Sequence, residues 1–217
     1  MGGDRRPIAT RERSWAQALA AFLVRTGARP NAISVGSIVF GAVAAGAIAG
    51  TEVAEGAGRW LWVAGAAGIQ LRLLANMLDG MVAVDSGASS PVGELYNEIP
   101  DRVSDVLVLA ALGFVGGSSP HLGWGAAVLA VIVAYVRAMG AVAGAGQVFA
   151  GVMAKPQRMF VCTVLCIFQA AVPDAWRDAR WIGLGPAGLT LALISAGSAV
   201  TCITRLMLIG RALRARP

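Results

Sequence analysis

Long apolar segments recur along this chain and constrain its fold more than any other feature of the sequence. A helix needs about 20 mostly apolar residues to cross the hydrocarbon core of a bilayer. Segments near that length follow one another here with short breaks. They cover approximately residues 32–48, 60–84, 92–115, 122–144, 159–172 and 184–209. Only 14% of the 217 residues are charged, against about a quarter in soluble domains. We therefore expect an all-α polytopic membrane bundle of six transmembrane helices.

The N-terminal region differs from these spans. Residues 1–13 are polar and rich in arginine, which predicts a basic tail. Over residues 14–29, apolar side chains fall at helical spacing, but the segment is too short to cross a bilayer. We expect an amphipathic juxtamembrane helix there, lying in the interface. The remaining residues, 30–217, are predicted to form one six-helix domain.

Basic residues indicate how the bundle is oriented. The net charge is +6, but most basic residues sit at the ends of predicted spans, which favours a membrane surface over nucleic acid as their partner. The side that holds the N-terminus carries eleven, and they are Arg5, Arg6, Arg11, Arg13, Arg25, Arg29, Lys155, Arg158, Arg211, Arg214 and Arg216. The opposite side carries three, and they are Arg59, Arg177 and Arg180. Cytoplasmic loops are enriched in such residues, so both termini are predicted to lie in the cytoplasm, with the protein in an inner or plasma membrane.

Carboxylates gather where the second and third spans meet. Six of the twelve Asp and Glu residues lie between positions 79 and 105. A charge near the bilayer centre costs about 2.5–3.5 kcal/mol on insertion scales, so such residues usually mark function. Helical spacing aligns two polar stripes, and they consist of Arg72, Asn76, Asp79, Gly80 and Ala83 on one helix and of Gly93, Asn97, Asp101 and Asp105 on the next.

Two helices joined by a short loop would pack side by side, so the stripes would converge at the cytoplasmic face. Carboxylate and amide oxygens are the ligands that Mg²⁺ and Mn²⁺ prefer, and a divalent metal site is the expectation. The structural alternative is a polar network that only holds the two helices together. A transporter or ion-binding membrane protein is a further alternative.

Residues 76–83 (NMLDGMVA) and 93–101 (GELYNEIPD) resemble the signature of the CDP-alcohol phosphotransferase family. That signature reads D-x-x-D-G-x-x-A-R, then eight or nine residues, then G-x-x-x-D-x-x-x-D. The resemblance implies a six-helix membrane enzyme, commonly a homodimer, with an amphipathic helix before the first span. It further implies transfer of a substituted phosphate from a CDP-linked donor to an alcohol, with release of CMP. CDP-diacylglycerol is the expected donor, with another CDP-alcohol as the alternative.

The resemblance also implies roles for individual residues. Asp101 would be the base that accepts the proton of the acceptor hydroxyl. The metal ligands would be Asn76, Asp79, Asn97 and Asp101, and Asp105, one turn beyond Asp101 on the same face, would restore charge that the amides lack. The nucleotide would contact Asp79, Gly80, Ala83 and Gly93, and Arg72, one turn before Asn76, would take the place of the family arginine beside the diphosphate. The acceptor or its phosphate would contact Arg137, Lys155 and Arg158, although membrane-surface anchoring explains Lys155 and Arg158 equally well.

The chain departs from the family pattern at three positions. Asn76 and Asn97 stand where the family has its first and third aspartates, and Val84 stands where it has arginine. The two amides remove two negative charges and should weaken metal binding. A relative that binds CDP-lipid without turnover is therefore a further alternative. The sequence leaves the acceptor open among inositol phosphate, glycerol phosphate, serine and other alcohols.

Overall fold

The computed structural model describes residues 11, 13–54, 56–87 and 91–215, without the side chains of 91, 92 and 94. Most of these residues lie in eight helices. The helices are α1 (Ser14–Arg25), α2 (Pro30–Gly50), α3 (Gly58–Asp85), α4 (Pro91–Gly113), α5 (Pro120–Val142), α6 (Lys155–Ala171), α7 (Asp174–Arg177) and α8 (Pro186–Arg214). Proline begins α2, α5 and α8 and is the second residue of α6. Its fixed φ suits the first helical turn, and its missing N–H leaves no intrahelical hydrogen bond unmade there.

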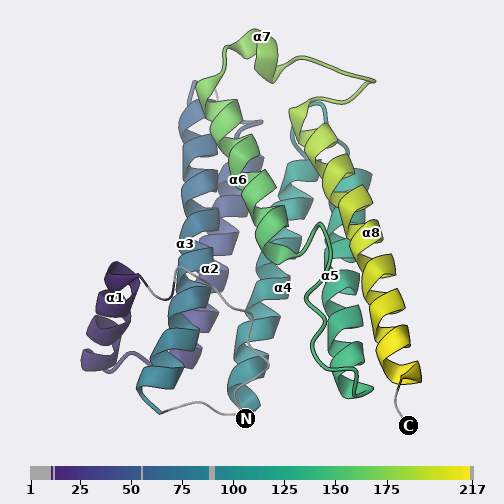
Figure 1. The fold of residues 1–217 in the computed structure, drawn as a ribbon. Coiled ribbons are helices and arrows are strands. Elements are labelled where there is room, and N and C mark those ends of the chain that lie inside the picture. Colours follow the sequence, from purple (N-terminus) through teal and green to yellow (C-terminus); the bar gives the residue numbers. More distant parts are fainter. Residues whose placement is uncertain (1–10, 12, 55, 88–90, 216–217) are drawn as a thin grey trace.

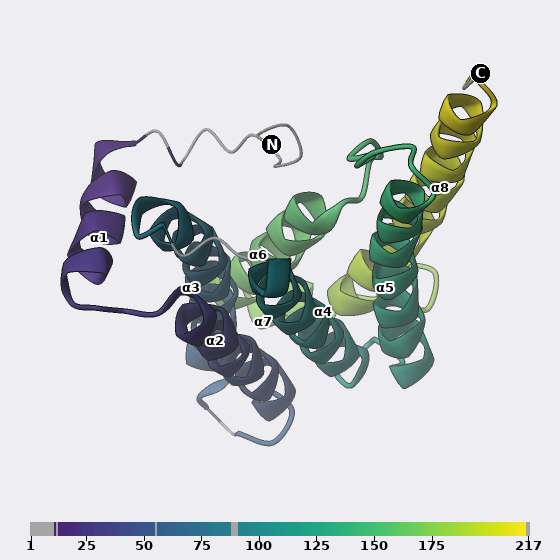
Figure 2. The same cartoon turned by 90° about the horizontal axis from the view of Figure 1, so that it is seen from below.

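The six long helices form a bundle whose helices run up and down along a common direction (Figure 1). α2 packs against α3 and α4, α5 packs against α4 and α8, and α6 packs against α3 and contacts α8. Seen from the end of the bundle, α1 lies outside α2 and α3, and α8 lies at the opposite edge (Figure 2). The C-terminal end of α8 lies at the same end of the bundle as the C-terminal end of α3.

The predicted spans agree with the six long helices, and the boundaries differ by a few residues. Within the described residues, four helices are long and apolar enough to cross a membrane, and they are α2, α3, α5 and α8. The other two long helices carry the charged residues of the site. α4 contains Pro100 and several ionisable side chains, and α6 has only 17 residues.

The short helix α1 coincides with most of the predicted amphipathic segment 14–29. It ends at Arg25, and Gly27 follows with φ of +73°, a left-handed conformation that glycine adopts without strain. Ala16 and Ala20 are buried in its contact with α3, whereas Trp15 and Phe22 are exposed. The predicted basic tail falls almost wholly on residues outside the described ranges.

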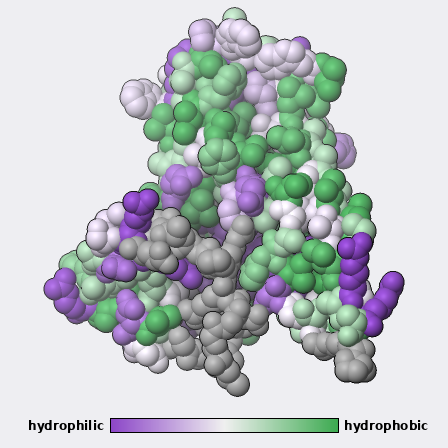
Figure 3. Space-filling model, viewed as in Figure 1, coloured by the Kyte–Doolittle hydropathy of each residue, from purple (hydrophilic) through white to green (hydrophobic). Residues whose placement is uncertain are grey.

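Hydrophobic side chains cover the flank of the bundle above α1, while hydrophilic ones gather around α1 and the lower end of α8 (Figure 3). The interior is filled by Trp62, Ile48, Ile69 and other apolar side chains. Small residues allow the helices to approach closely. Gly41 of α2 faces Ser104 of α4, and Gly140 of α5 faces Ile209 of α8. Both glycines therefore pack helices within the chain.

The contact at Gly41 leads to a stability prediction. A Cβ atom at Gly41 would lie 2.6 Å from the Ser104 Oγ, whereas at Gly46 on the same helix nothing lies within 4 Å of such an atom. Gly41→Val is expected to lower the free energy of unfolding by about 1–3 kcal/mol, because it overpacks the α2–α4 crossing. Gly46→Val should leave it nearly unchanged. Thermal unfolding of both variants in detergent tests this, and equal midpoints would contradict it.

Candidate functional site

The site forms where α3, α4 and the first turn of α6 meet. After α5, the segment 143–154 runs back along the bundle, so that α6 begins part of the way up instead of at its end (Figure 1). This path brings Lys155 and Arg158 to the polar stripes of α3 and α4. Both cations therefore lie inside the bundle, where anchoring to a membrane surface does not account for them.

Asn76, Asn97, Asp101 and Lys155 form one hydrogen-bonded group. The Asn76 amide nitrogen donates to the Asn97 side-chain oxygen at 2.8 Å. The Lys155 ammonium donates to the Asn76 side-chain oxygen at 2.6 Å and also to the Asp101 Oδ2. The Lys155 side chain is 18% exposed and that of Asp101 5%. One face of this group is thus accessible from outside.

Behind this group lies a chain of buried ion pairs. The Arg72 guanidinium lies 3.1 Å from the Asp101 Oδ1 and 2.7 Å from the Asp105 Oδ1, and it also donates to the Asp101 backbone carbonyl at 2.9 Å. Arg158 donates to the Asp105 Oδ2 at 2.7 Å and to the Met153 carbonyl at 3.1 Å. Arg72 and Arg158 are fully buried. Each guanidinium compensates a carboxylate that would otherwise be desolvated without a partner.

A third group is more accessible. The Glu98 carboxylate lies 2.6 Å from the Arg137 guanidinium and 3.2 Å from that of Arg102. Arg137 is further stacked over the Phe149 ring, 5.5 Å from its centroid. The counter-charge that an arginine inside a span requires is therefore Glu98. Arg102 and Arg137 have side chains 22% and 17% exposed, so they are available to an anionic ligand.

Asp79 points to a different neighbour. Ser34 of α2 donates to the Asp79 Oδ2 at 2.5 Å. The other carboxylate oxygen, Oδ1, is buried and has no hydrogen-bond partner within the described part of the chain. Asp79 thus holds one buried acceptor atom whose lone pairs the described side chains leave unused.

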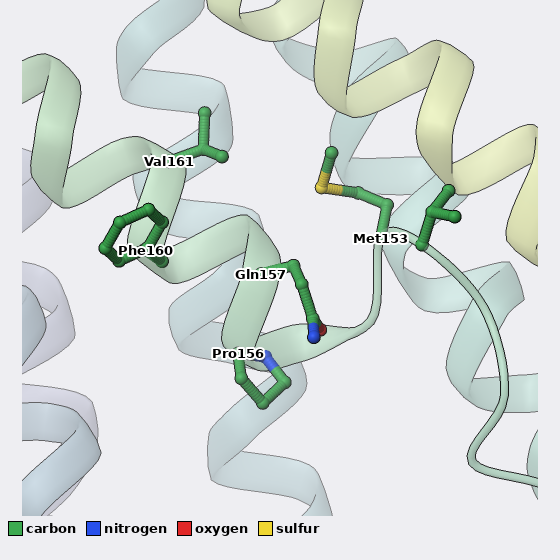
Figure 4. A pocket seen from close by; sticks show the side chains of 6 residues that line it. Met153, Pro156, Gln157, Phe160 and Val161 are labelled. Atoms are coloured by element: carbon green, nitrogen blue, oxygen red, sulfur yellow. The ribbon is translucent and has the colours of Figure 1, made fainter.

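Two hollows flank the site. One, of about 420 Å³, lies at the start of α6 and is lined by Val152, Met153, Pro156, Gln157, Phe160 and Val161. Figure 4 shows Met153 opposite α6, with Gln157 and Val161 nearer to it and Phe160 on the other side of the helix. The other, of about 480 Å³, lies between α1 and α3 and is lined by Arg11, Gln17, Ala21, Gly80, Met81, Val84 and Asp85.

The structure brings together most of the residues singled out in the sequence, but not in the arrangement expected. Asn76, Asn97 and Asp101 share one group, whereas Asp105 belongs to the buried ion pairs and Asp79 contacts α2. Gly80 lines a hollow, and Ala83 and Gly93 are half-buried on the same stripes. Arg158, expected to contact the acceptor, has a side chain only 1% exposed.

Sequence reasoning missed two contributions. Ser34 gives no signal, because a serine in an apolar span is common. Lys155 was expected at an acceptor phosphate, yet it lies among the predicted metal ligands. One feature of the sequence does single it out, because it is the sole lysine among eighteen basic residues.

Comparison with known proteins gives the following relatives. No family model matches the chain. The archaetidylinositol phosphate synthase of Aeropyrum pernix is 32% identical over 146 residues, which cover 66% of this chain and 69% of the relative. The phosphatidylinositol phosphate synthase of Streptomyces avermitilis is 25% identical over 198 residues, which cover 88% of this chain and 76% of the relative.

Solved structures with the same fold include two of the Mycobacterium tuberculosis phosphatidylinositol phosphate synthase. Its complex with manganese and citrate superimposes with a TM-score of 0.72 at 18% identity, covering 90% of this chain and 88% of the other. Its structure with CDP-DAG bound superimposes with a TM-score of 0.69 at 18% identity, covering 89% of this chain and 92% of the other.

Together with these relatives, the helical bundle and its polar site define a membrane enzyme of the transferase class. The similarity to the Aeropyrum synthase identifies the group more narrowly. The chain belongs to the CDP-alcohol phosphatidyltransferase family.

This family is divalent-metal dependent, and the manganese complex is one example. The side chains between Asn76 and Asp101 do not fit such an ion in this structure. An ammonium group engages the oxygens of both residues, and the Asn76 nitrogen, which cannot ligate a cation, points to Asn97. Among the described residues, no group of three or more His, Cys, Asp or Glu side chains is placed to hold a metal ion.

Proposed function

We propose that this protein transfers the phosphatidyl group of CDP-diacylglycerol to an inositol phosphate and releases CMP. The observation that carries the proposal is a set of three partly exposed cations on neighbouring carboxylates of α4: Lys155 pairs with Asp101, and Arg102 and Arg137 pair with Glu98. A donor diphosphate and an acceptor phosphate are both anions, and fixed cations bind them by charge-assisted hydrogen bonds.

The relatives support the choice of substrates. The Mycobacterium tuberculosis synthase has been solved with CDP-DAG bound. The Streptomyces and Aeropyrum relatives are synthases of inositol phosphate lipids. An inositol phosphate offers the hydroxyl that the transfer requires and a phosphate that Arg137 and Arg102 can bind.

The hollows suggest how the donor lies. The hollow at the start of α6 is lined mainly by apolar side chains, and it suits the start of an acyl chain entering from the bilayer. The hollow at Gly80 suits the cytidine, because it opens next to the helix backbone and the Arg11 guanidinium, 3.4 Å from the place of a Cβ at Gly80, lies at its edge. The diphosphate would then lie between the two hollows, next to the Lys155 ammonium.

The reaction follows from this arrangement. The acceptor hydroxyl oxygen attacks the phosphorus that carries the diacylglycerol, a new O–P bond forms, and the P–O bond to CMP breaks. Asp101 accepts the hydroxyl proton, since its Oδ2 has lone-pair capacity beyond the hydrogen bond from Lys155. Lys155 stabilises the negative charge that develops on the departing CMP. Arg72 and Arg158 hold Asp101 and Asp105 in place from within the bundle.

We place six helices across the membrane, with α1 on its surface and both termini in the cytoplasm. Lys155 and Arg158 lie inside the bundle, so the count of basic residues becomes nine against three (11 − 2 = 9), which still favours this orientation. A homodimer is the proposed assembly, as in the family. Cysteine accessibility and chemical cross-linking in native membranes test these two points.

The proposed activity is tested by CMP release from CDP-diacylglycerol by purified protein, across a panel of alcohols. Release that depends on an inositol phosphate, and not on glycerol phosphate or serine, is the expected result. Release with glycerol phosphate or serine alone would assign a different acceptor.

A relative that binds CDP-lipid without turnover is the second candidate. It is favoured by the engagement of both Asp101 carboxylate oxygens with cations. Binding of CDP-diacylglycerol in the absence of any CMP release would support this candidate over the transferase.

A further inference from the structure

Lys155 occupies an unusual place for a lysine. It is the first residue of α6, and the return of segment 143–154 into the bundle brings it to the polar stripes of α3 and α4. Its ammonium donates to an amide oxygen of α3 and to a carboxylate of α4. These are the side chains at the first and fourth aspartate positions of the family signature. The lysine therefore connects two residues that the family uses as metal ligands.

The formal charge of this group is less negative than that of the family signature. Four aspartates carry a formal charge of −4. Here Asn76 and Asn97 are neutral, Asp79 and Asp101 contribute −2, and Lys155 adds +1, which gives −1. A divalent cation is attracted far less to such a set, and it would also have to displace or approach the ammonium. The two amides and the ammonium thus both lower the attraction of this set for a metal ion.

The hydrogen bonds are oriented for the ammonium. Asn76 directs its nitrogen to Asn97 and its oxygen to Lys155, so a donor–acceptor relay runs from Lys155 through Asn76 to Asn97. An ammonium has three N–H donors, and Asn76 and Asp101 accept two of them within the described part of the chain. The third is available to an anion on the accessible side.

The identity of the residue fits this role as well. Seventeen of the eighteen basic residues are arginine. Lysine presents a compact, strongly hydrated point charge, whereas the arginine guanidinium is a wide planar fork. A compact ammonium group fits between the Asn76 and Asp101 side-chain oxygens. Among the cationic side chains it resembles a metal ion most, because its charge is concentrated on one atom.

We infer that the Lys155 ammonium replaces a divalent cation between Asn76 and Asp101, so that this protein binds the diphosphate of its CDP-linked lipid without a metal ion at that position. The assignment of the ligand rests on the proposed function. The replacement of the ion rests only on Lys155, Asn76, Asn97 and Asp101.

The first test measures metal binding directly. Purified protein in detergent is titrated with Mn²⁺, and free Mn²⁺ is followed by electron paramagnetic resonance. The wild type is expected to leave the free-ion signal undiminished. The triple variant Asn76→Asp, Asn97→Asp, Lys155→Met restores four carboxylates and should bind Mn²⁺, which diminishes the free-ion signal. Stoichiometric Mn²⁺ binding by the wild type that is lost in Asn76→Ala would overturn the inference, and this outcome needs no folded triple variant.

The second test separates the inference from the proposed function. Binding of short-chain CDP-diacylglycerol is measured with and without EDTA. The wild type should bind equally in both, and Lys155→Met should bind at least tenfold more weakly, with Lys155→Arg failing to restore binding because the guanidinium is too wide. Wild-type binding abolished by EDTA would contradict the inference. No binding under any condition, together with an undiminished Mn²⁺ signal, would refute the proposed donor and leave the replacement of the ion standing.

Discussion

Arg158→Met is expected to lower the free energy of unfolding by about 3–5 kcal/mol, because it removes one partner of a buried ion pair and leaves a desolvated carboxylate behind. Arg158 is almost fully enclosed, pairs with Asp105 at 2.7 Å and donates to the Met153 carbonyl. Methionine fills similar space but carries no donor. Unfolding of purified protein in mixed micelles, followed by circular dichroism, measures the change.

A matched control is available at the opposite end of the bundle. Arg59 pairs with Asp174 at 3.2 Å, and their side chains are 48% and 74% exposed. Hydrogen bonds from Arg177 and Arg59 hold the pKa of the Asp174 carboxyl below its usual value, but an exposed pair contributes little to stability. Arg59→Met should leave the unfolding midpoint unchanged. If both variants unfold alike, the buried pair does not stabilise the bundle as described.

A second substitution tests why Arg158→Met lowers the free energy of unfolding. Because an unpaired carboxylate causes most of the expected cost, Asp105→Asn added to Arg158→Met should recover part of it. Asp105 also pairs with Arg72, so recovery will be incomplete. A double variant less stable than Arg158→Met alone would show that the Arg72–Asp105 pair matters more than the charge left behind.

Asp101→Asn is expected to reduce CMP release by about 10²–10⁴-fold, the usual contribution of a general base. The amide is nearly isosteric but cannot accept the hydroxyl proton. Binding of CDP-diacylglycerol should persist, because Asn76 still accepts from Lys155 and Asp105 still pairs with Arg72. Single-turnover CMP release and equilibrium lipid binding are measured on the same preparation.

The control for this variant is Asp174→Asn, which changes an exposed carboxylate on α7, far from the site along the bundle. It should keep wild-type release. Full turnover by Asp101→Asn would place the base elsewhere. Loss of lipid binding together with turnover would instead make Asp101 a residue that holds Lys155 and Arg72 in position.

Sequence patterns predicted the helices well, because span length, proline positions and helical spacing are local properties. The stripes through Asn76 and Asp101 also follow from spacing alone. The start of α6 inside the bundle was not predictable in this way. Periodicity gives the face on which Lys155 lies but not its depth, which depends on how segment 143–154 returns. The contact between Ser34 and Asp79 likewise depends on the packing of α2 against α3.

The burial of Lys155 and Arg158 bears on the order in which the chain enters the membrane during synthesis. Each charge placed in the bilayer costs about 2.5–3.5 kcal/mol on insertion scales, and α6 is not among the described helices that are apolar enough to span by themselves. The carboxylates that neutralise these cations lie 54 and 53 residues earlier in the chain. α4 therefore leaves the ribosome before α6, and α6 is expected to settle in the bilayer only after Asp101 and Asp105 are in place to receive it.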